Sequence, residues 1–351
     1  PEKMFSNYLY KTNTSSKNLL HFKNYASEVN KLFKKKKGKI LDIASNYGTF
    51  LNFFNKKKFF RLGIDPAKNL KKITNSKGIL QIDNFFTDKF SNQIKEKFQQ
   101  FDIITANHVC AHVENLNDFF LGVKNLLKDD GIFIFEISYR GSVLKKNTFD
   151  TIYHEHLDYH ALFPISKFLK KFKLHLFNFK ITEAQGGSLR IYASKNYKTT
   201  NQKKINNQIF KEKNYYKLFN ISTYKKFEKK INDCKNKLHE ILKNFYKKNY
   251  KIAGYGAAAK TTTLLNYFDL SKNKNIKYIF DDNKLKQDLY LPGTTIKILN
   301  PKHLFYKNLD ILIIFAWNYS DVIIKNINKN KLFKKQSLKF LIPFPNPKIV
   351  K

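Results

Sequence analysis

Four consecutive polar residues, Tyr153-His154-Glu155-His156, carry the side chains best suited to chemistry in this sequence. A phenol, two imidazoles and a carboxylate in one turn can remove a proton from a weak acid and stabilise the anion that remains. Further along the chain follows a second polar segment, Gly186-Gly187-Ser188-Leu189-Arg190. Both segments lie downstream of an α/β pattern of the kind that binds nucleotides, and the elements of that pattern must position them.

The apolar run Lys39-Ile40-Leu41-Asp42-Ile43-Ala44 follows an amphipathic segment near residues 15–35 and predicts a buried parallel strand. Similar runs recur with helical patterns such as 117–127 between them, at 60–65, 101–106 and 131–138. This alternation predicts a doubly wound sheet. The last pair of runs, 174–182 and 188–195, is joined by Gln185-Gly186-Gly187 and predicts an antiparallel hairpin. A sheet closed by such a hairpin is the class I methyltransferase arrangement, whereas a dinucleotide-binding domain continues in parallel.

A second α/β unit begins at Gly254-Tyr255-Gly256-Ala257-Ala258-Ala259-Lys260, after a long polar stretch without Pro or Gly. The polar stretch predicts a helical connector. We therefore expect four parts along the chain: an N-terminal lid and helical segment at 1–35, a class I methyltransferase domain at 36–198, the connector at 199–248, and a second Rossmann-like domain at 249–351.

The composition restricts the class of protein. Hydrophobic residues make up 42% of the 351 positions, enough for buried cores, and no apolar stretch approaches the ~20 residues of a membrane helix. Cys110 and Cys234 are too few for a disulfide framework or a thiolate zinc site, which indicates a reducing cytoplasm. The formal charge of +39 comes from lysine, with arginine only at Arg61, Arg140 and Arg190, whereas nucleic-acid surfaces favour arginine. We expect a cytoplasmic monomer without a membrane partner or a specific nucleic-acid partner.

Acidic and amide residues follow the predicted strands. Asp42 lies in the first strand, and the turn after it, up to Gly48, brings backbone N–H groups close to a ligand. Asp65 ends the second strand, where a carboxylate can accept both hydroxyls of a ribose. Asp83 follows the third strand and can face an adenine edge, and Asn107 begins the loop after the fourth. Turn and helix-cap chemistry also favours Asp and Asn, so both interpretations stay open.

Eight motifs occur in order along nearly the whole chain: Asn46-Tyr47-Gly48-Thr49, Gly63-Ile64-Asp65-Pro66, His112-Val113, Tyr153-His154-Glu155-His156, Gly186-Gly187-Ser188-Leu189-Arg190, Gly254-Tyr255-Gly256-Ala257-Ala258-Ala259-Lys260, Leu291-Pro292-Gly293-Thr294 and Trp317-Asn318-Tyr319. With these motifs the sequence resembles the S-adenosylmethionine-dependent sugar C-methyltransferases. The resemblance implies methyl transfer to a carbon beside the ketone of a nucleotide-linked ketodeoxysugar, with dTDP as the expected nucleotide.

The resemblance also implies roles for individual residues. Carbon is a poor nucleophile until its proton leaves, so the enzyme needs a general base. His156 is the expected base, and Glu155 is expected to orient it or to hold its proton. The other catalytic candidates are Tyr153, His154 and His112. S-adenosylmethionine is expected at Asp42, Ala44, Asn46, Gly48, Asp65, Asp83 and Asn107. The nucleotide-linked sugar is expected at Tyr8, Tyr10, Arg190, Tyr255, Lys260, Asp281, Trp317 and Asn318, although Arg190 can instead brace the hairpin.

The sequence departs from the family in two places. Family members typically begin with a cysteine-rich zinc module, whereas this sequence has no cysteine before Cys110; either the module lies outside the sequence or this member lacks it. Ala44 stands where glycine is usual and could crowd the cofactor. His154 and His156 share one face of an extended segment, but no third ligand is evident, so we expect no metal. Two alternatives stay open: an NAD(P)-dependent nucleotide-sugar oxidoreductase, and an RNA-binding or RNA-modifying protein.

Overall fold

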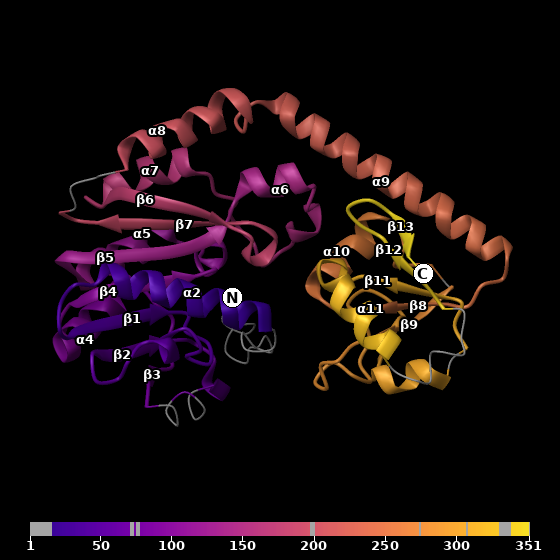
Figure 1. Cartoon of the computed structure of the whole chain (residues 1–351), viewed down its shortest axis with the longest axis horizontal. Coiled ribbons are helices and arrows are strands. Elements are labelled where there is room, and N and C mark those ends of the chain that lie inside the picture. The colour runs from indigo at the N-terminus through magenta and orange to yellow at the C-terminus, as the bar shows by residue number, and fades with distance from the viewer. Residues whose placement is uncertain are drawn as a thin grey trace. The chain divides into compact units, whose positions relative to one another are not determined.

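The computed structural model of the chain describes residues 16–70, 74, 78–196, 201–273, 275–306, 308–329 and 338–350. The chain divides into two compact units (Figure 1). Unit 1 comprises Pro1–Ser142 and Glu155–Phe219, and unit 2 comprises Val143–His154 and Asn220–Lys351. The chain therefore contributes one short segment to unit 2 before it completes unit 1. No helix among the described residues is long and apolar enough to cross a membrane.

Unit 1 is built on a seven-stranded sheet with the order β3-β2-β1-β4-β5-β7-β6. Its strands are β1 Gly38–Ile43, β2 Phe59–Ile64, β3 Leu80–Ile82, β4 Phe101–Asn107, β5 Leu127–Ser138, β6 His175–Thr182 and β7 Ser188–Ser194. β1 to β5 run parallel, and β7 pairs antiparallel with both β5 and β6. Gly186 and Gly187 turn the chain between β6 and β7 with φ angles of 92° and 130°, which glycine adopts without steric cost. The predicted parallel strands and antiparallel hairpin are confirmed.

Helices cover both faces of this sheet because successive residues of a strand point to opposite sides. Ile134 of β5 packs in the cluster beneath α2 (Ser16–Leu32), whereas the neighbouring Phe133 contacts Phe120 of α5 (Leu116–Leu126). The other α-helices among the described residues of this part of the chain are α4 Asp88–Phe98, α6 Arg140–Lys146, α7 Leu162–Lys171 and α8 Gln202–Phe210. α6 begins in unit 1 and ends in unit 2.

The N-terminus of α7 is capped by a residue from a distant part of the chain. Glu212, in a π-helical turn after α8, accepts backbone hydrogen bonds from Leu162 at 2.8 Å and from Phe163 at 2.9 Å. Its side chain is fully buried. A carboxylate at this end of a helix satisfies free N–H groups and complements the helix dipole, so Glu212 ties α8 to α7.

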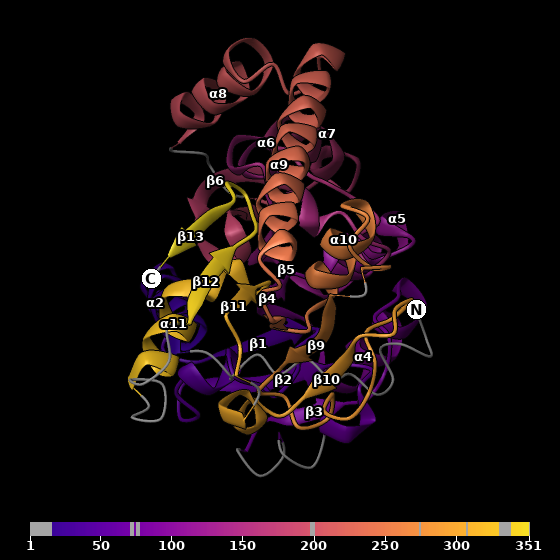
Figure 2. The ribbon, with the colours of Figure 1, turned by 90° about the vertical axis from the view of Figure 1, so that its right-hand side faces the viewer.

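Unit 2 contains a six-stranded sheet with the order β10-β9-β8-β11-β12-β13, in which only β12 and β13 are antiparallel neighbours. Its strands are β8 Ile252–Tyr255, β9 Ile276–Phe280, β10 Lys297–Leu299, β11 Ile311–Ile314, β12 Lys339–Ile342 and β13 Lys348–Val350. α10 (Ala259–Tyr267) and α11 (Ser320–Lys329) lie on opposite faces of the sheet, and the long α9 (Ile221–Lys247) joins the core on the side of α10 (Figure 2). The predicted second α/β unit is confirmed.

The short inserted segment is anchored in the core of unit 2. Its 3₁₀ turn η4 (Phe149–Thr151) carries Phe149, which stacks on Phe268 at a ring distance of 5.2 Å and meets Phe344 edge-on at 5.0 Å. Aromatic pairs of this kind stabilise a core beyond the area that they bury. The anchor fixes the chain a few residues before Tyr153.

Candidate functional site

Asp42 lies where the carboxyl ends of β1 and β4 meet in unit 1. Its side chain is 2% exposed and accepts hydrogen bonds from the Thr105 hydroxyl at 2.6 Å and from the Asn107 amide at 3.3 Å. Burial raises the pKa of Asp42 to about 7. A buried carboxylate of this kind ionises readily when a cation approaches.

The loop after β1 is held by Asp65, the residue that follows β2. One oxygen of Asp65 accepts the backbone N–H of Asn46 at 2.8 Å, and the other accepts that of Ala67 at 2.9 Å. Ala44, Asn46 and Gly48 have left-handed φ angles of 58°, 49° and 61°, so Ala44 occupies a conformation that glycine adopts without strain. A carboxylate has about four acceptor positions, so Asp65 can still accept ribose hydroxyls.

These residues fit S-adenosylmethionine, which carries an ammonium and a sulfonium and therefore needs acceptors and anions around it. Oδ1 of Asn107 is buried and has no hydrogen-bond partner among the described residues, so it offers an acceptor beside Asp42. Asp83 is half-buried directly after β3. The first three strands thus each end in or next to a carboxylate, which suits a cationic ligand.

His112, in the loop after β4, and His156, in the segment after η4, come together in unit 1. Their ring centroids are 4.9 Å apart, and Nδ1 of His112 lies 2.6 Å from the carbonyl oxygen of Glu155. Because a carbonyl only accepts, Nδ1 of His112 carries the proton and Nε2 is its basic nitrogen. Burial lowers the pKa of His112, which favours the neutral form. We predicted that the side chain of Glu155 supports His156. The hydrogen bond to His112 comes instead from the backbone carbonyl of Glu155, so it does not test that prediction.

The four residues of the motif are divided between the units. Tyr153 and His154 group with unit 2, where their rings are 6.1 Å apart, and Glu155 and His156 group with unit 1. The segment forms a turn rather than the extended stretch on which a shared face of His154 and His156 was predicted. Within the described residues, no group of three His, Cys, Asp or Glu side chains could hold a metal ion.

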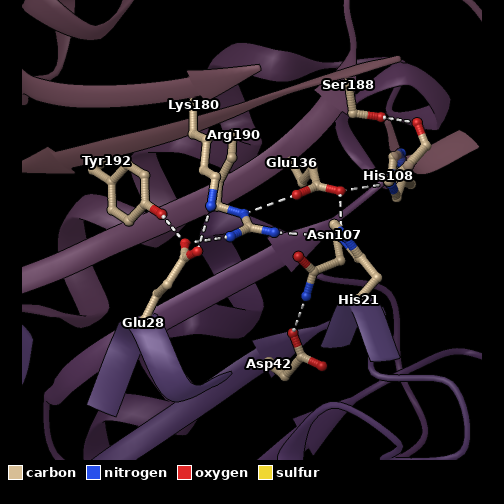
Figure 3. A network of polar contacts seen from close by, with 11 residues as sticks. His21, Glu28, Asp42, Asn107, His108, Glu136, Lys180, Ser188, Arg190 and Tyr192 are labelled. Carbon is tan, nitrogen blue, oxygen red and sulfur yellow. Dashed lines mark hydrogen bonds and ion pairs between the residues drawn. The ribbon is translucent and has the colours of Figure 1, made fainter. Parts of the chain in front are cut away.

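Glu136, in β5, is the centre of a buried polar network that sequence reasoning missed (Figure 3). Its side chain is 1% exposed. Its Oε1 lies 2.8 Å from Nε2 of His21 and 3.3 Å from Nε2 of His108, and its Oε2 accepts the Nε proton of Arg190 at 2.8 Å. Burial alone would raise the pKa of Glu136, but the bonds to both histidines and the charge of Arg190 hold it well below its usual range. Glu136 is therefore ionised and anchors two imidazoles.

Arg190, one of the predicted substrate residues, lies inside this network. Its side chain is 2% exposed, its Nη1 donates to Glu28 of α2 at 2.8 Å, and its guanidinium stacks on the ring of Tyr25 at 3.5 Å. These contacts favour the bracing role, because they tie β7 to α2. Two other predicted substrate residues, Tyr8 and Tyr10, lie outside the described residues.

In unit 2, the turn after β8 repeats the geometry of the loop after β1. Asp281, the residue after β9, accepts the backbone N–H of Ala257 at 2.7 Å through one oxygen and that of Asn283 at 2.8 Å through the other. The hydroxyl of Tyr255 donates to Asp282 at 2.8 Å, and both residues line a pocket of about 310 Å³. The edge of this second sheet is therefore also shaped to receive a ligand.

The remaining predicted residues of unit 2 lie near the start of α10 and after β11. Lys260 is the second residue of α10 and is half-buried. The indole of Trp317 donates to Asp150 at 2.7 Å, and Asp150 has no exposed surface. Burial raises the pKa of Asp150, and the charge of Lys260 and the bond from Trp317 oppose that rise. Asn318 is exposed. Sequence reasoning missed Asp150, because nothing in the local sequence around it indicates a contact with Trp317.

Two sequence families match consecutive parts of the chain. Residues 19–182 match the family described as a methyltransferase domain, and residues 183–345 match the family described as a C-methyltransferase C-terminal domain. The chain is a C-methyltransferase. This enzyme uses S-adenosylmethionine, and the class I methyltransferase fold with a second Rossmann-like domain is confirmed.

The C-methyltransferase NovU of Streptomyces niveus is 27% identical to the chain over 311 residues, which cover 89% of this chain and 73% of NovU. Among solved structures, the PH0226 protein of Pyrococcus horikoshii OT3 matches 52% of this chain and 93% of its own, with 16% identity and a TM-score of 0.41. The plantazolicin methyltransferase BpumL, solved with S-adenosylhomocysteine, matches 53% of this chain and 87% of its own, with 14% identity and a TM-score of 0.40. The match to NovU thus extends over most of the chain.

Proposed function

We propose that this C-methyltransferase methylates a carbon beside the ketone of a nucleotide-linked ketodeoxysugar, with dTDP as the nucleotide. The observation that carries the proposal is the pair of imidazoles of His112, after β4, and His156, after η4, whose ring centroids are 4.9 Å apart. Methylation of a heteroatom needs little help with proton removal, whereas a carbon acid requires a positioned base. We further propose that the enzyme acts in the cytoplasm, as a monomer and without nucleic acid.

His156 is the proposed base. It accepts the proton beside the ketone, and the electron pair of the broken C–H bond forms the enolate. His112, whose neutral form burial favours, is held through Nδ1 by the Glu155 carbonyl and is proposed to orient His156 or the substrate. Bound S-adenosylmethionine supplies an electrophilic methyl group and leaves as S-adenosylhomocysteine. Tyr153 and His154 are proposed to hydrogen-bond the sugar.

Unit 2 is the proposed binding domain for the nucleotide. The turn after β8 leads into the N-terminus of α10, whose N–H groups and whose Lys260 suit a diphosphate. Asp281 holds this turn through the backbone of Ala257. Trp317 and Asn318 are proposed to contact the same ligand.

The base is tested by hydrogen exchange without methyl transfer. Enzyme, S-adenosylhomocysteine and a panel of nucleotide-linked ketosugars in deuterium oxide should exchange the acidic carbon-bound hydrogen of the true acceptor. His156→Ala should reduce exchange and methylation together by roughly 10²–10⁴-fold, the usual effect of a lost general base. His175→Ala, an exposed histidine on β6, is the matched control and should leave both rates unchanged.

Normal exchange by His156→Ala would show that the base is another residue, and His112→Ala would be tested next. An RNA that is methylated in preference to every ketosugar of the panel would instead favour the RNA-modifying alternative. The screen itself identifies the sugar, the nucleotide and the methylated carbon.

A further inference from the structure

His108, which none of the roles above includes, is the first residue after β4. It follows Asn107, whose amide contacts Asp42 in the cofactor site. The φ angle of His108 is 55°, a left-handed conformation that is unusual for a residue with a side chain. Its backbone N–H donates to the carbonyl oxygen of Glu136 at 2.7 Å, which holds this conformation. Strained residues that the surrounding fold holds in place are concentrated at functional sites.

The ring of His108 is oriented by the same residue that holds its backbone. Nε2 lies 3.3 Å from Oε1 of Glu136, and because an ionised carboxylate only accepts, Nε2 carries a proton (Figure 3). Among the described residues, the ring is bonded through Nε2 alone, which leaves Nδ1 for another partner. The side chain is 25% exposed, so a ligand can reach it. A carboxylate that fixes one ring nitrogen so that the other can act is the standard arrangement for acid–base histidines.

Glu136 is suited to this task because it stays ionised. Arg190 bonds its second oxygen and is itself held by Glu28, so Glu136 cannot turn away from His108. His21 shares the first oxygen from the side of α2. In the part of the chain that the structure describes, the titratable groups near His108 are Glu136 on β5, His21 on α2 and His112 in the following loop. Arg190 on β7 bonds the same carboxylate, and Asp42 on β1 contacts the neighbouring Asn107.

We propose that His108, positioned by Glu136, hydrogen-bonds the carbonyl oxygen of the methyl acceptor and stabilises the enolate. Protonated His108 keeps its Nδ1 proton and donates a hydrogen bond through it to this oxygen, while His156 takes the proton from carbon. When the carbon forms its bond to the methyl group, the carbonyl double bond forms again and the proton stays on Nδ1. The proposal rests on the proposed function and adds the acid to its base.

This pair of roles predicts a bell-shaped dependence of kcat on pH. The base His156 must be neutral, so kcat falls at low pH, and the donor His108 must be protonated, so kcat falls at high pH. A purely structural His108 would leave the shape of the profile unchanged. If His108 were itself the base, its removal would abolish the limb at low pH instead.

The test compares His108→Asn with His175→Asn. Asparagine tolerates the left-handed backbone better than other residues with side chains but has no titratable group, and His175 is an exposed histidine on β6. With the ketosugar that the wild-type enzyme methylates, His108→Asn should lower kcat by about 10²–10³-fold, as expected for a lost oxyanion donor. KM and the affinity for S-adenosylhomocysteine should change little, and the limb at high pH should disappear. His175→Asn should match the wild type throughout.

The outcomes separate the two proposals. If the wild-type enzyme methylates no nucleotide-linked ketosugar, the proposed function fails. If the wild type is active and His108→Asn retains either its kcat or the limb at high pH, the role of His108 is refuted and the proposed function stands. If His108→Asn binds S-adenosylhomocysteine poorly, His108→Gln takes its place, and the same limb must disappear.

Discussion

Asp65 and Asp281 form a matched pair in one chain, and exchanging each for alanine tests which sheet edge binds S-adenosylmethionine. Each carboxylate follows the second strand of its sheet order and accepts two backbone N–H groups. The distances are 2.8 and 2.9 Å for Asp65 and 2.7 and 2.8 Å for Asp281. The two variants therefore remove the same local contacts, but from different sites.

The size of the effect follows from these contacts. A hydrogen bond to a charged group contributes about 1.5–3 kcal/mol, and the freed N–H groups of a loop can bind water, so each variant should lose roughly 2–3 kcal/mol of stability. If Asp65 also accepts the ribose hydroxyls, Asp65→Ala should lose a further ~1–3 kcal/mol of binding free energy, which is about 5–150-fold in Kd. Asp281→Ala should keep the affinity of the wild type for S-adenosylmethionine.

Titration calorimetry with S-adenosylmethionine gives both Kd values, and urea unfolding gives the stability of both variants. Equal Kd values for Asp65→Ala and the wild type would refute the cofactor role of Asp65. An equal loss of affinity in both variants would mean that loosening either turn weakens binding, and it would contradict a ribose contact made by Asp65. Loss of affinity for the acceptor in Asp281→Ala alone would support the nucleotide site.

Three further predictions concern buried charges. Burial raises the pKa of Asp42 to about 7, so S-adenosylmethionine, a cation, should bind more tightly as the pH rises through about 7 and should release a proton on binding. Calorimetry in buffers of different ionisation enthalpy detects this proton release, and Asp42→Asn should abolish it. Glu212→Ala should lower the free energy of unfolding by about 2–4 kcal/mol, because two N–H groups of α7 lose a charged acceptor; an unchanged urea midpoint would contradict this. Arg190→Lys should lower the free energy of unfolding by about 3–5 kcal/mol, because one ammonium does not reproduce the separate Nε and Nη1 donors that bond Glu136 and Glu28; a variant as stable as the wild type in thermal unfolding would contradict the bracing role.

The fold of unit 1 was predictable because its signals are local. Buried parallel strands such as β4 appear in the sequence as short apolar runs, and Gly186-Gly187 marks a turn that only flexible backbone makes easily. The positions of Asp42 and Asp65, the acids that we predict to bind the cofactor, were predictable for a related reason. The carboxyl ends of parallel strands share one edge, so their positions in the sequence already predict that they are neighbours.

The Glu136 network was not predictable because its members come from separate elements. His21 and Glu136 are 115 positions apart, and Glu136 and Arg190 are 54 apart. The sequence alone favours a structural or surface role for His108, since a lone histidine after a strand has no pattern around it. Only the pairing of Asn107 with Glu136 in adjacent strands brings the following histidine beside the carboxylate. The register between β4 and β5 therefore determines which residues are neighbours in this network, and the sequence specifies that register only through the packing of the whole sheet.

The two sheets repeat one plan, and the single residue that differs most indicates what each binds. β3-β2-β1-β4-β5 and β10-β9-β8-β11-β12 have the same order, and each second-strand acid holds the turn after the first strand. Asp42 of β1 pairs with Gly63, which lies just before Asp65 in the chain, and Gly254 of β8 pairs with Ile279, which lies just before Asp281. Asp42 and Gly254 therefore occupy corresponding positions in the two sheets. A Cβ at Gly254 would lie 2.6 Å from Ile279, so no carboxylate fits there. β1 thus carries a buried acid that suits a cation, whereas β8 has a glycine at the corresponding position and Lys260 lies at the start of α10, which supports an anionic ligand in unit 2.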